Sequence, residues 1–252
     1  MPAKQHGVLV FILTTVIGLT LLQSGCNFRS WHPPTPLIKS DLLTKEPIAR
    51  NPALLQPELA KATAPKTFDA KFETTKGDFT ITVHRDWAPH AADRFYNMIQ
   101  VGYFESDIAI FRAVDGFMFQ FGIHGDPAVN SAWSDTTMPD DPPKGIQNIP
   151  GTLSFAQTGS PNSRSVQMFC NLGMNSSLDQ PQPGGGSPFV PFAEVKQGRS
   201  VLNKINTEYG ENSPRDNVQG KFKKQGNDYI LDRFKNIDLI KSVTILELDN
   251  AK

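Results

Sequence analysis

The sequence predicts an all-β domain with two or three helices, folded as a closed eight-stranded antiparallel β-barrel. Eight short runs with the pattern of strands follow one another between Lys71 and Leu248, and only two stretches have the pattern of a helix. Many short strands with few helices are typical of antiparallel sheets, and closing such a sheet into a barrel removes its exposed edges. The chain of 252 residues is long enough for one such domain with appendages.

The first elements of this domain are a hairpin and a helix. Strands are predicted at Lys71–Thr75 and Phe79–Val83, around a tight turn at Gly77. A helix is predicted to begin at Pro89, because the missing N–H of proline costs nothing at the first helical position, and to end at Gly102. Its apolar stripe consists of Ala91, Ala92, Phe95, Met98 and Ile99.

Six further strands complete the predicted barrel. They are Ile108–Val114, Phe117–Gly122, Thr152–Ala156, Gln167–Asn171, Phe192–Lys196 and Val243–Leu248. A second, short helix is predicted at Ser200–Ile205. Two stretches, Ala128–Pro150 and Tyr209–Phe234, are predicted as long insertions, and the second is rich in lysine. Such charge predicts a solvated loop, with a partner-docking surface as the alternative.

The first 26 residues have the layout of an export signal. Lys4 precedes an apolar run, Val8–Leu22, that is shorter than the roughly 20 residues needed to cross a bilayer. Small residues then come directly before Cys26, and the segment resembles a bacterial lipoprotein signal, which implies lipid attachment at Cys26. Gln23 stands where that signal usually has Leu. A cleaved ordinary signal and an uncleaved anchor remain as alternatives, and all three place the rest of the chain outside the cytoplasm.

The next segment, residues 27–67, is rich in proline and predicts an extended tether. Each proline removes a backbone donor and disrupts a helix or strand. The tether would lift a domain spanning 68–248 off a membrane surface, with a short tail at 249–252. We therefore expect an exported protein, anchored to a membrane on its periplasmic or extracellular side.

The strongest functional signal runs from Phe111 to Gly122, with the sequence FRAVDGFMFQFG. It resembles the central motif of the cyclophilins, in which an Arg leaves one strand and a Gly-Phe-Met-x-Gln run begins the next. Two further blocks, GTLSFAQ from Gly151 and SVQMFCN from Ser165, are similar to later cyclophilin motifs and occur in the same order. The resemblance covers about Phe68 to Glu247 and implies a cyclophilin-like barrel with peptidyl-prolyl cis-trans isomerase activity.

The residue types in these blocks suit that chemistry. Rotation about an X-Pro bond makes and breaks no bond, so it needs a hollow for the proline ring and a donor that favours the twisted amide. A fixed guanidinium can be that donor, and we expect Arg112 to be the catalytic residue. Met118 and Gln120 share one strand face, as do Gln167 and Phe169. This mixture of apolar and polar side chains is typical of a site rather than of a core.

The resemblance assigns the remaining site residues. The proline pocket would be lined by Phe117, Met118, Phe169 and Leu178, and the peptide chain would be contacted by Ala156, Gln157 and Gln167. Gln120 would orient both Arg112 and the substrate backbone. Phe189 falls where many cyclophilins have a His, and it keeps an aromatic wall at that point.

Two functions of different class follow from these residues. The first is an enzyme that accelerates X-Pro isomerisation in exported proteins and so assists their folding; the second is a binding module that holds proline-containing polypeptides with little catalysis. A hydrolase using Ser154 or Ser165 is disfavoured, because neither lies in a nucleophile-elbow pattern. The 25 basic side chains balance 25 acidic ones, so no nucleic-acid partner is expected. We expect a monomer with no cofactor and no metal.

Overall fold

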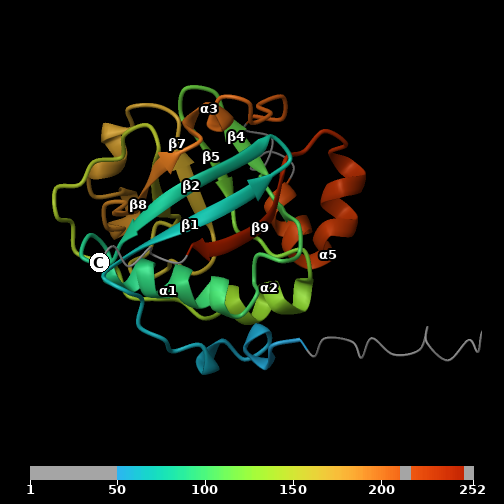
Figure 1. Cartoon of the computed structure of the whole chain (residues 1–252), viewed down its shortest axis with the longest axis horizontal. Coiled ribbons are helices and arrows are strands. Elements are labelled where there is room, and N and C mark those ends of the chain that lie inside the picture. The colour runs from blue at the N-terminus through green and yellow to red at the C-terminus, as the bar shows by residue number, and fades with distance from the viewer. Residues whose placement is uncertain (1–49, 211–216, 247–252) are drawn as a thin grey trace, which may run out of the picture. The chain divides into compact units, whose positions relative to one another are not determined.

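The computed structural model describes residues 50–210 and 217–246, which all belong to one compact unit (Figure 1). Its centre is a nine-stranded sheet in which every ladder is antiparallel, in the order β3-β9-β1-β2-β8-β6-β7-β5-β4. The strands are β1 (Thr67–Thr74), β2 (Gly77–His84), β3 (Ile108–Ala109), β4 (Arg112–Val114), β5 (Met118–Phe121), β6 (Thr152–Phe155), β7 (Met168–Asn171), β8 (Pro191–Gln197) and β9 (Leu239–Leu246). The predicted antiparallel all-β class with few helices is confirmed.

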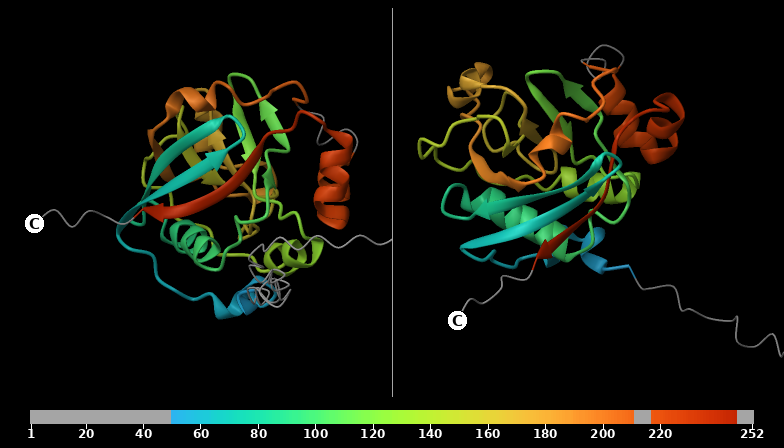
Figure 2. Two further views of the ribbon diagram at one scale, coloured as in Figure 1. Left: turned by 45° about the vertical axis from the view of Figure 1, so that its right-hand side comes forward. Right: turned by 45° about the horizontal axis from the view of Figure 1, so that its top comes forward.

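The number of strands and the way the sheet closes differ from the prediction. The predicted strand Ile108–Val114 is divided, because β3 pairs with β9 whereas β4 pairs with β5. Between them, the Ile110 N–H donates to the Asp238 carbonyl at 2.8 Å. The described sheet therefore has nine strands rather than eight. Figure 2 shows that the sheet is curled. In the described part of the chain its two end strands share no ladder, and the segment Ile110–Phe111 joins them covalently.

The core of the sheet is built from phenylalanines. Phe72 on β1 stacks on Phe79 of β2 at a centroid distance of 4.7 Å and on Phe95 at 6.0 Å. Phe95 belongs to α1 (Pro89–Gln100), which matches the predicted helix. The second predicted helix is present as α3 (Arg199–Leu202). Burying these aromatic rings removes apolar surface from water and so stabilises the curled sheet.

Each predicted insertion contains a helix, so the prediction of a solvated loop at Tyr209–Phe234 is wrong over residues 218–233. Helix α2 (Pro127–Ser134) begins after Asp126, whose carboxylate accepts the Ala128 N–H at 2.9 Å. Helix α5 (Val218–Arg233) buries Phe222 and Ile230 in a second, smaller apolar cluster that includes residues of β3 and β9. This helix is stabilised by packing its apolar side chains against residues distant in the sequence. The charge composition of the stretch does not reveal such packing.

The prediction of an extended tether is wrong for its last part. Residues 51–64 form a strap that contains two 3₁₀ turns, Pro52–Leu54 and Pro57–Leu59, and packs against α1 and α2. The Asn97 side chain accepts the Ala62 N–H at 2.9 Å and donates to the Ala62 carbonyl at 2.7 Å. The Trp133 indole donates to the Ala53 carbonyl at 3.1 Å. Prolines shape these short turns, and side chains from α1 and α2 satisfy the freed backbone groups.

The membrane-anchor prediction concerns residues that the structure does not describe. Cys26, the signal segment, residues 27–49 of the tether and the tail at 249–252 all lie outside the described ranges. Within those ranges, none of the helices combines the length and the apolar character that a bilayer span requires.

Candidate active site

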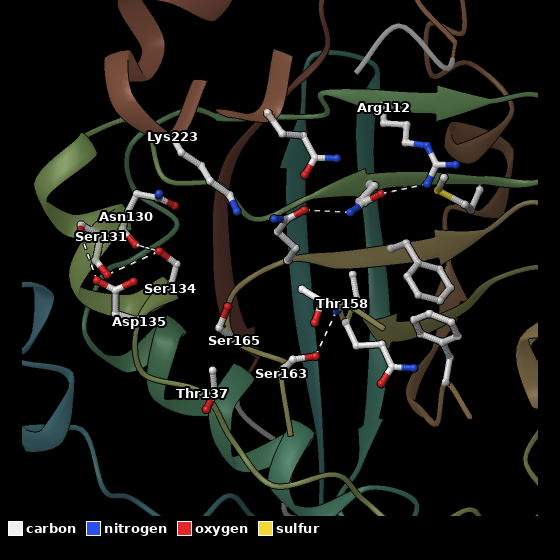
Figure 3. Close-up of a pocket in the computed structure, with 18 of the residues that line it drawn as sticks. Arg112, Asn130, Ser131, Ser134, Asp135, Thr137, Thr158, Ser163, Ser165 and Lys223 are labelled. Atoms are coloured by element: carbon white, nitrogen blue, oxygen red, sulfur yellow. Dashed lines mark hydrogen bonds between the residues drawn. The ribbon is translucent and has the colours of Figure 1, made fainter. Parts of the chain in front are cut away.

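A cleft of about 780 Å³ opens on β4, β5 and β7 and continues between α2 and α5 (Figure 3). The structure brings all ten predicted catalytic and substrate-binding residues to its wall. They are Arg112, Phe117, Met118, Gln120, Ala156, Gln157, Gln167, Phe169, Leu178 and Phe189. The two strand-face pairs expected from the alternation, Met118 with Gln120 and Gln167 with Phe169, both face this cleft.

A chain of hydrogen bonds orients Arg112. Its Nη1 donates to Gln120 Oε1 at 3.1 Å, and Gln120 Nε2 donates to Gln167 Oε1 at 2.8 Å. The β-ladder explains this row, because Arg112 on β4 lies directly opposite Gln120 on β5. The guanidinium also lies 5.7 Å from the centre of the Phe117 ring. Arg112 is thus held at the wall with its charged end beside an aromatic face.

The neighbouring part of the cleft is an apolar hollow. Met118 and Phe169 form its floor and are 2% and 4% exposed. Phe189 meets Phe169 edge to face at a centroid distance of 5.4 Å, and Leu178 completes the wall. A hollow lined by aromatic and aliphatic side chains binds a small apolar ring by removing its surface from water.

A buried asparagine that the sequence analysis missed positions the loop carrying Leu178 and Phe189. Asn148 Nδ2 donates to Asp179 Oδ1 and to the Phe189 carbonyl, each at 2.8 Å. The Phe189 N–H in turn donates to the Leu178 carbonyl at 2.9 Å. The sequence gives no sign of this long-range role, because an asparagine in a proline-rich stretch is ordinary.

A buried ion pair supports the outer wall. The Arg164 guanidinium binds Asp140, donates to the Pro188 carbonyl at 2.8 Å and lies 5.9 Å from the Phe189 ring centre. Burial opposes ionisation of Asp140, but hydrogen bonds from the Asn162 amide and the Ser187 hydroxyl, together with the Arg164 charge, hold the pKa of this carboxyl below its usual range. The pair fixes the rim of the hollow.

The cleft also has a polar half that the sequence analysis did not predict. It is lined by Asn130, Ser131, Ser134, Asp135, Thr137, Thr158, Ser163, Ser165, Gln219, Lys223 and Lys224. These residues come largely from α2 and α5. Because the sequence analysis did not predict these two helices, it could not predict that their residues line the cleft.

The cleft does not support the hydrolase alternative. Ser154 is fully buried and donates to Asn148 Oδ1 at 2.9 Å. Ser165 lies at the cleft, but no histidine is among the described residues that line it, so the usual base beside a nucleophilic serine is missing there. Over the residues that the structure describes, no group of three or more potential metal ligands comes together.

A curled antiparallel sheet with an arginine beside an apolar hollow defines a cyclophilin-like protein. The pattern of the family "Cyclophilin type peptidyl-prolyl cis-trans isomerase/CLD" matches residues 69–224, more than half of the sequence. The chain belongs to this family and is a peptidyl-prolyl cis-trans isomerase that acts on proline-containing peptides. The matched region excludes the strap and ends inside α5.

Curated relatives agree with this membership, and a solved structure agrees with the fold. Peptidyl-prolyl cis-trans isomerase B of Escherichia coli (strain K12) is 30% identical over 135 residues, which cover 53% of this chain and 81% of the relative. Peptidyl-prolyl cis-trans isomerase A of Dickeya dadantii (strain 3937) is 28% identical over 149 residues, or 59% and 76% of the two chains. A crystal structure of a cyclophilin type isomerase from Cryptosporidium parvum covers 72% of this chain and 99% of its own, with a TM-score of 0.51 and 16% identity, and supports the fold.

Proposed function

We propose that this isomerase accelerates X-Pro rotation in exported polypeptides, assisting their folding, and that Arg112 is its catalytic residue. The observation that carries the catalytic assignment is the Arg112–Gln120–Gln167 row beside the apolar hollow. A donor and a ring-binding surface are thus adjacent on one wall.

The chemistry follows from the substrate. Resonance stiffens the peptide C–N bond and raises a barrier of about 18–20 kcal/mol to rotation. When the bond twists, the prolyl nitrogen regains its lone pair and can accept a hydrogen bond. A preorganised guanidinium donating at that point favours the twisted state over the planar one and contributes on the order of 3–4 kcal/mol. Arg112 performs this step without any exchange of bonds.

The other residues hold the substrate during rotation. Seating the proline ring in the hollow fixes one side of the bond, so that only the other side turns. Gln120 keeps the guanidinium in place, because its amide bridges Arg112 and Gln167. The proline ring is contacted by Phe117, Met118, Phe169 and Leu178, and Phe189 adds an aromatic wall. The peptide chain on either side of the proline is contacted by Ala156, Gln157 and Gln167.

Arg112→Ala in the full chain tests the catalytic assignment. We expect kcat/KM on an Ala-Pro peptide to fall about 10²–10³-fold, the usual effect of removing one transition-state donor. Arg233→Ala is a matched control, since Arg233 is an exposed arginine outside the cleft lining. The measurement is a protease-coupled isomerisation assay, with circular dichroism to check folding. Equal rates for Arg112→Ala and the unmodified chain would favour the binding module instead.

We also propose that the protein is exported and held by a lipid on Cys26. The support is the sequence of its first 26 residues, in which an apolar run ends in small residues before the cysteine. Mass spectrometry of the mature protein tests this, and the expected result is an N-terminal Cys26 that carries acyl chains. A mature chain that retains Met1, or one that starts elsewhere without lipid, would contradict lipidation.

A further inference from the structure

The polar half of the cleft carries positive charge that the isomerisation step does not use. Lys223 and Lys224 line it from α5, and Figure 3 shows the side chain of Lys223 extending from its helix into the cleft. Asp135 lies on the opposite side, at the end of α2, where it accepts a hydrogen bond from the Ser131 hydroxyl at 3.3 Å. No salt bridge joins either lysine to a carboxylate within the described residues.

The helix that carries these lysines is firmly attached to the barrel. Phe222, the residue directly before Lys223, is fully buried and meets Phe111 at a centroid distance of 6.2 Å. Asn227 donates its backbone N–H to the Gly125 carbonyl at 2.9 Å and its side-chain amide to the Ser106 carbonyl at 3.1 Å. The lysines therefore extend from a fixed helix, which lowers the entropy cost of using them for recognition.

A substrate whose proline ring occupies the hollow extends along the same cleft. Its flanking residues have room to pass from the apolar hollow toward the polar half, because the two halves form one continuous space. Two ammonium groups on α5 attract a carboxylate there, whereas Asp135 repels one from the α2 side. The attraction by two lysines outweighs the repulsion by one aspartate, so an acidic side chain of the substrate is favoured next to α5.

We propose that Lys223 and Lys224 bind the carboxylate of an Asp or Glu near the proline, so that the enzyme prefers acidic proline-containing segments. This inference rests on the proposed function of the cleft. Both lysines are at least partly exposed to water, so the preference is modest, about three- to fivefold in kcat/KM, as expected for exposed ion pairs. Added salt weakens it by screening.

Paired peptides on the full chain test the proposal. Each pair carries Glu or Gln at one position, from four residues before the proline to four after it, with the remaining positions neutral. The readout is the ratio of kcat/KM for the Glu peptide to that for the Gln peptide, together with binding measured by fluorescence anisotropy. We expect a ratio of about three to five at one position at least, falling toward one in 0.5 M NaCl.

Three variants distinguish a specific effect of Lys223 and Lys224 from an effect of the overall positive charge of α5. In Lys223→Gln/Lys224→Gln the ratio should fall to about one, and Lys223→Glu/Lys224→Glu should invert it. Lys221→Gln is the matched control, since Lys221 is an exposed residue of the same helix but does not line the cleft, and it should keep the ratio of the unmodified chain. A ratio of one at every position in the unmodified chain, or an equal loss in the control, overturns the inference. Absence of isomerisation with every peptide would instead refute the proposed function.

Discussion

Arg112 depends for its orientation on Gln120, a glutamine that is only 8% exposed. Both ends of the Gln120 amide are used, since its oxygen accepts from Arg112 and its nitrogen donates to Gln167. This fixes which way the amide faces. A hydrogen bond to a charged group in a partly dry site is stronger than a neutral one, so the row favours one position of the guanidinium.

Replacing Gln120 with Leu should therefore lower catalysis while Arg112 is still present. We expect kcat/KM to fall about 10- to 100-fold, because one hydrogen bond to a charged group is worth roughly 1.5–3 kcal/mol. The loss should appear mainly in kcat, since the proline hollow is unchanged. Steady-state kinetics on an Ala-Pro peptide measure it. Gln100→Leu, at an exposed position on α1, should match the unmodified chain, and a purely KM effect in Gln120→Leu would argue against a positioning role.

The sequence predicted the residues that line one wall of the cleft, but not the residues that surround that wall. Ten residues in ordered blocks define one wall of the cleft, because strand pairing brings those blocks together. The polar half could not be predicted, since Lys223 looks like part of a solvated charged run until Phe222 is known to be buried. The role of Asn148 could not be predicted either, because its hydrogen-bond partners are distant in the sequence.

At the scale of elements, α5 shows how tertiary packing can override local signals. Gly226 lies within the helix with φ 64° and ψ −151°, a conformation that is essentially restricted to glycine. A side chain at this position would collide with the Gly125 carbonyl. The glycine thus divides the helix and lets its second half turn against the barrel.

Gly226→Ala should consequently destabilise the protein strongly. Backbone strain and the collision together should cost about 3 kcal/mol or more, whereas strain alone costs about 1–3 kcal/mol. Urea denaturation followed by tryptophan fluorescence measures the free energy of unfolding. Gly145→Ala is the control, since Gly145 also has a positive φ, of 79°, but open space where the methyl group would lie. Similar losses in both variants would show that the contact with Gly125 is unimportant.

Helix α2 was readable in part. Asp126-Pro127 is a helix start, with an N-cap residue followed by proline at the first position. The short apolar pattern that follows does not by itself distinguish this helix from a loop. The strap is harder to predict, since its prolines exclude long helices and its short turns are stabilised by side chains distant in sequence, including Asp93, Asn97 and Trp133.

At the scale of the whole molecule, stability should depend on pH through His124. This residue is 4% exposed; its Nδ1 accepts the Asp126 N–H at 2.9 Å, and its Nε2 lies 2.8 Å from the Ser106 hydroxyl. Burial lowers the pKa of His124 to about 4. Protonation would add a charge in a desolvated place and break the bond from Asp126.

The sign of the effect follows from which state binds the proton. The unfolded chain protonates His124 near pH 6.5, whereas the folded chain resists until about pH 4. The free energy of unfolding should thus be highest above pH 6.5 and fall by up to about 3 kcal/mol as the pH drops from 6.5 to 4. Denaturation at several pH values measures this. In His124→Asn the slope in that window should be much smaller, and an unchanged slope would assign the effect to other groups.

The contacts of the strap limit how far the enzyme can be truncated from its N-terminus. One side of α2 lines the cleft through Ser131 and Ser134, while its Trp133 is sealed by the carbonyl of Ala53, 80 positions earlier in the chain. A truncation starting at Phe68, the boundary that the proline pattern indicated, would leave that indole without its acceptor and uncover the back of a cleft wall. We therefore expect a minimal active fragment to begin no later than Asn51, although the family pattern itself starts only at residue 69.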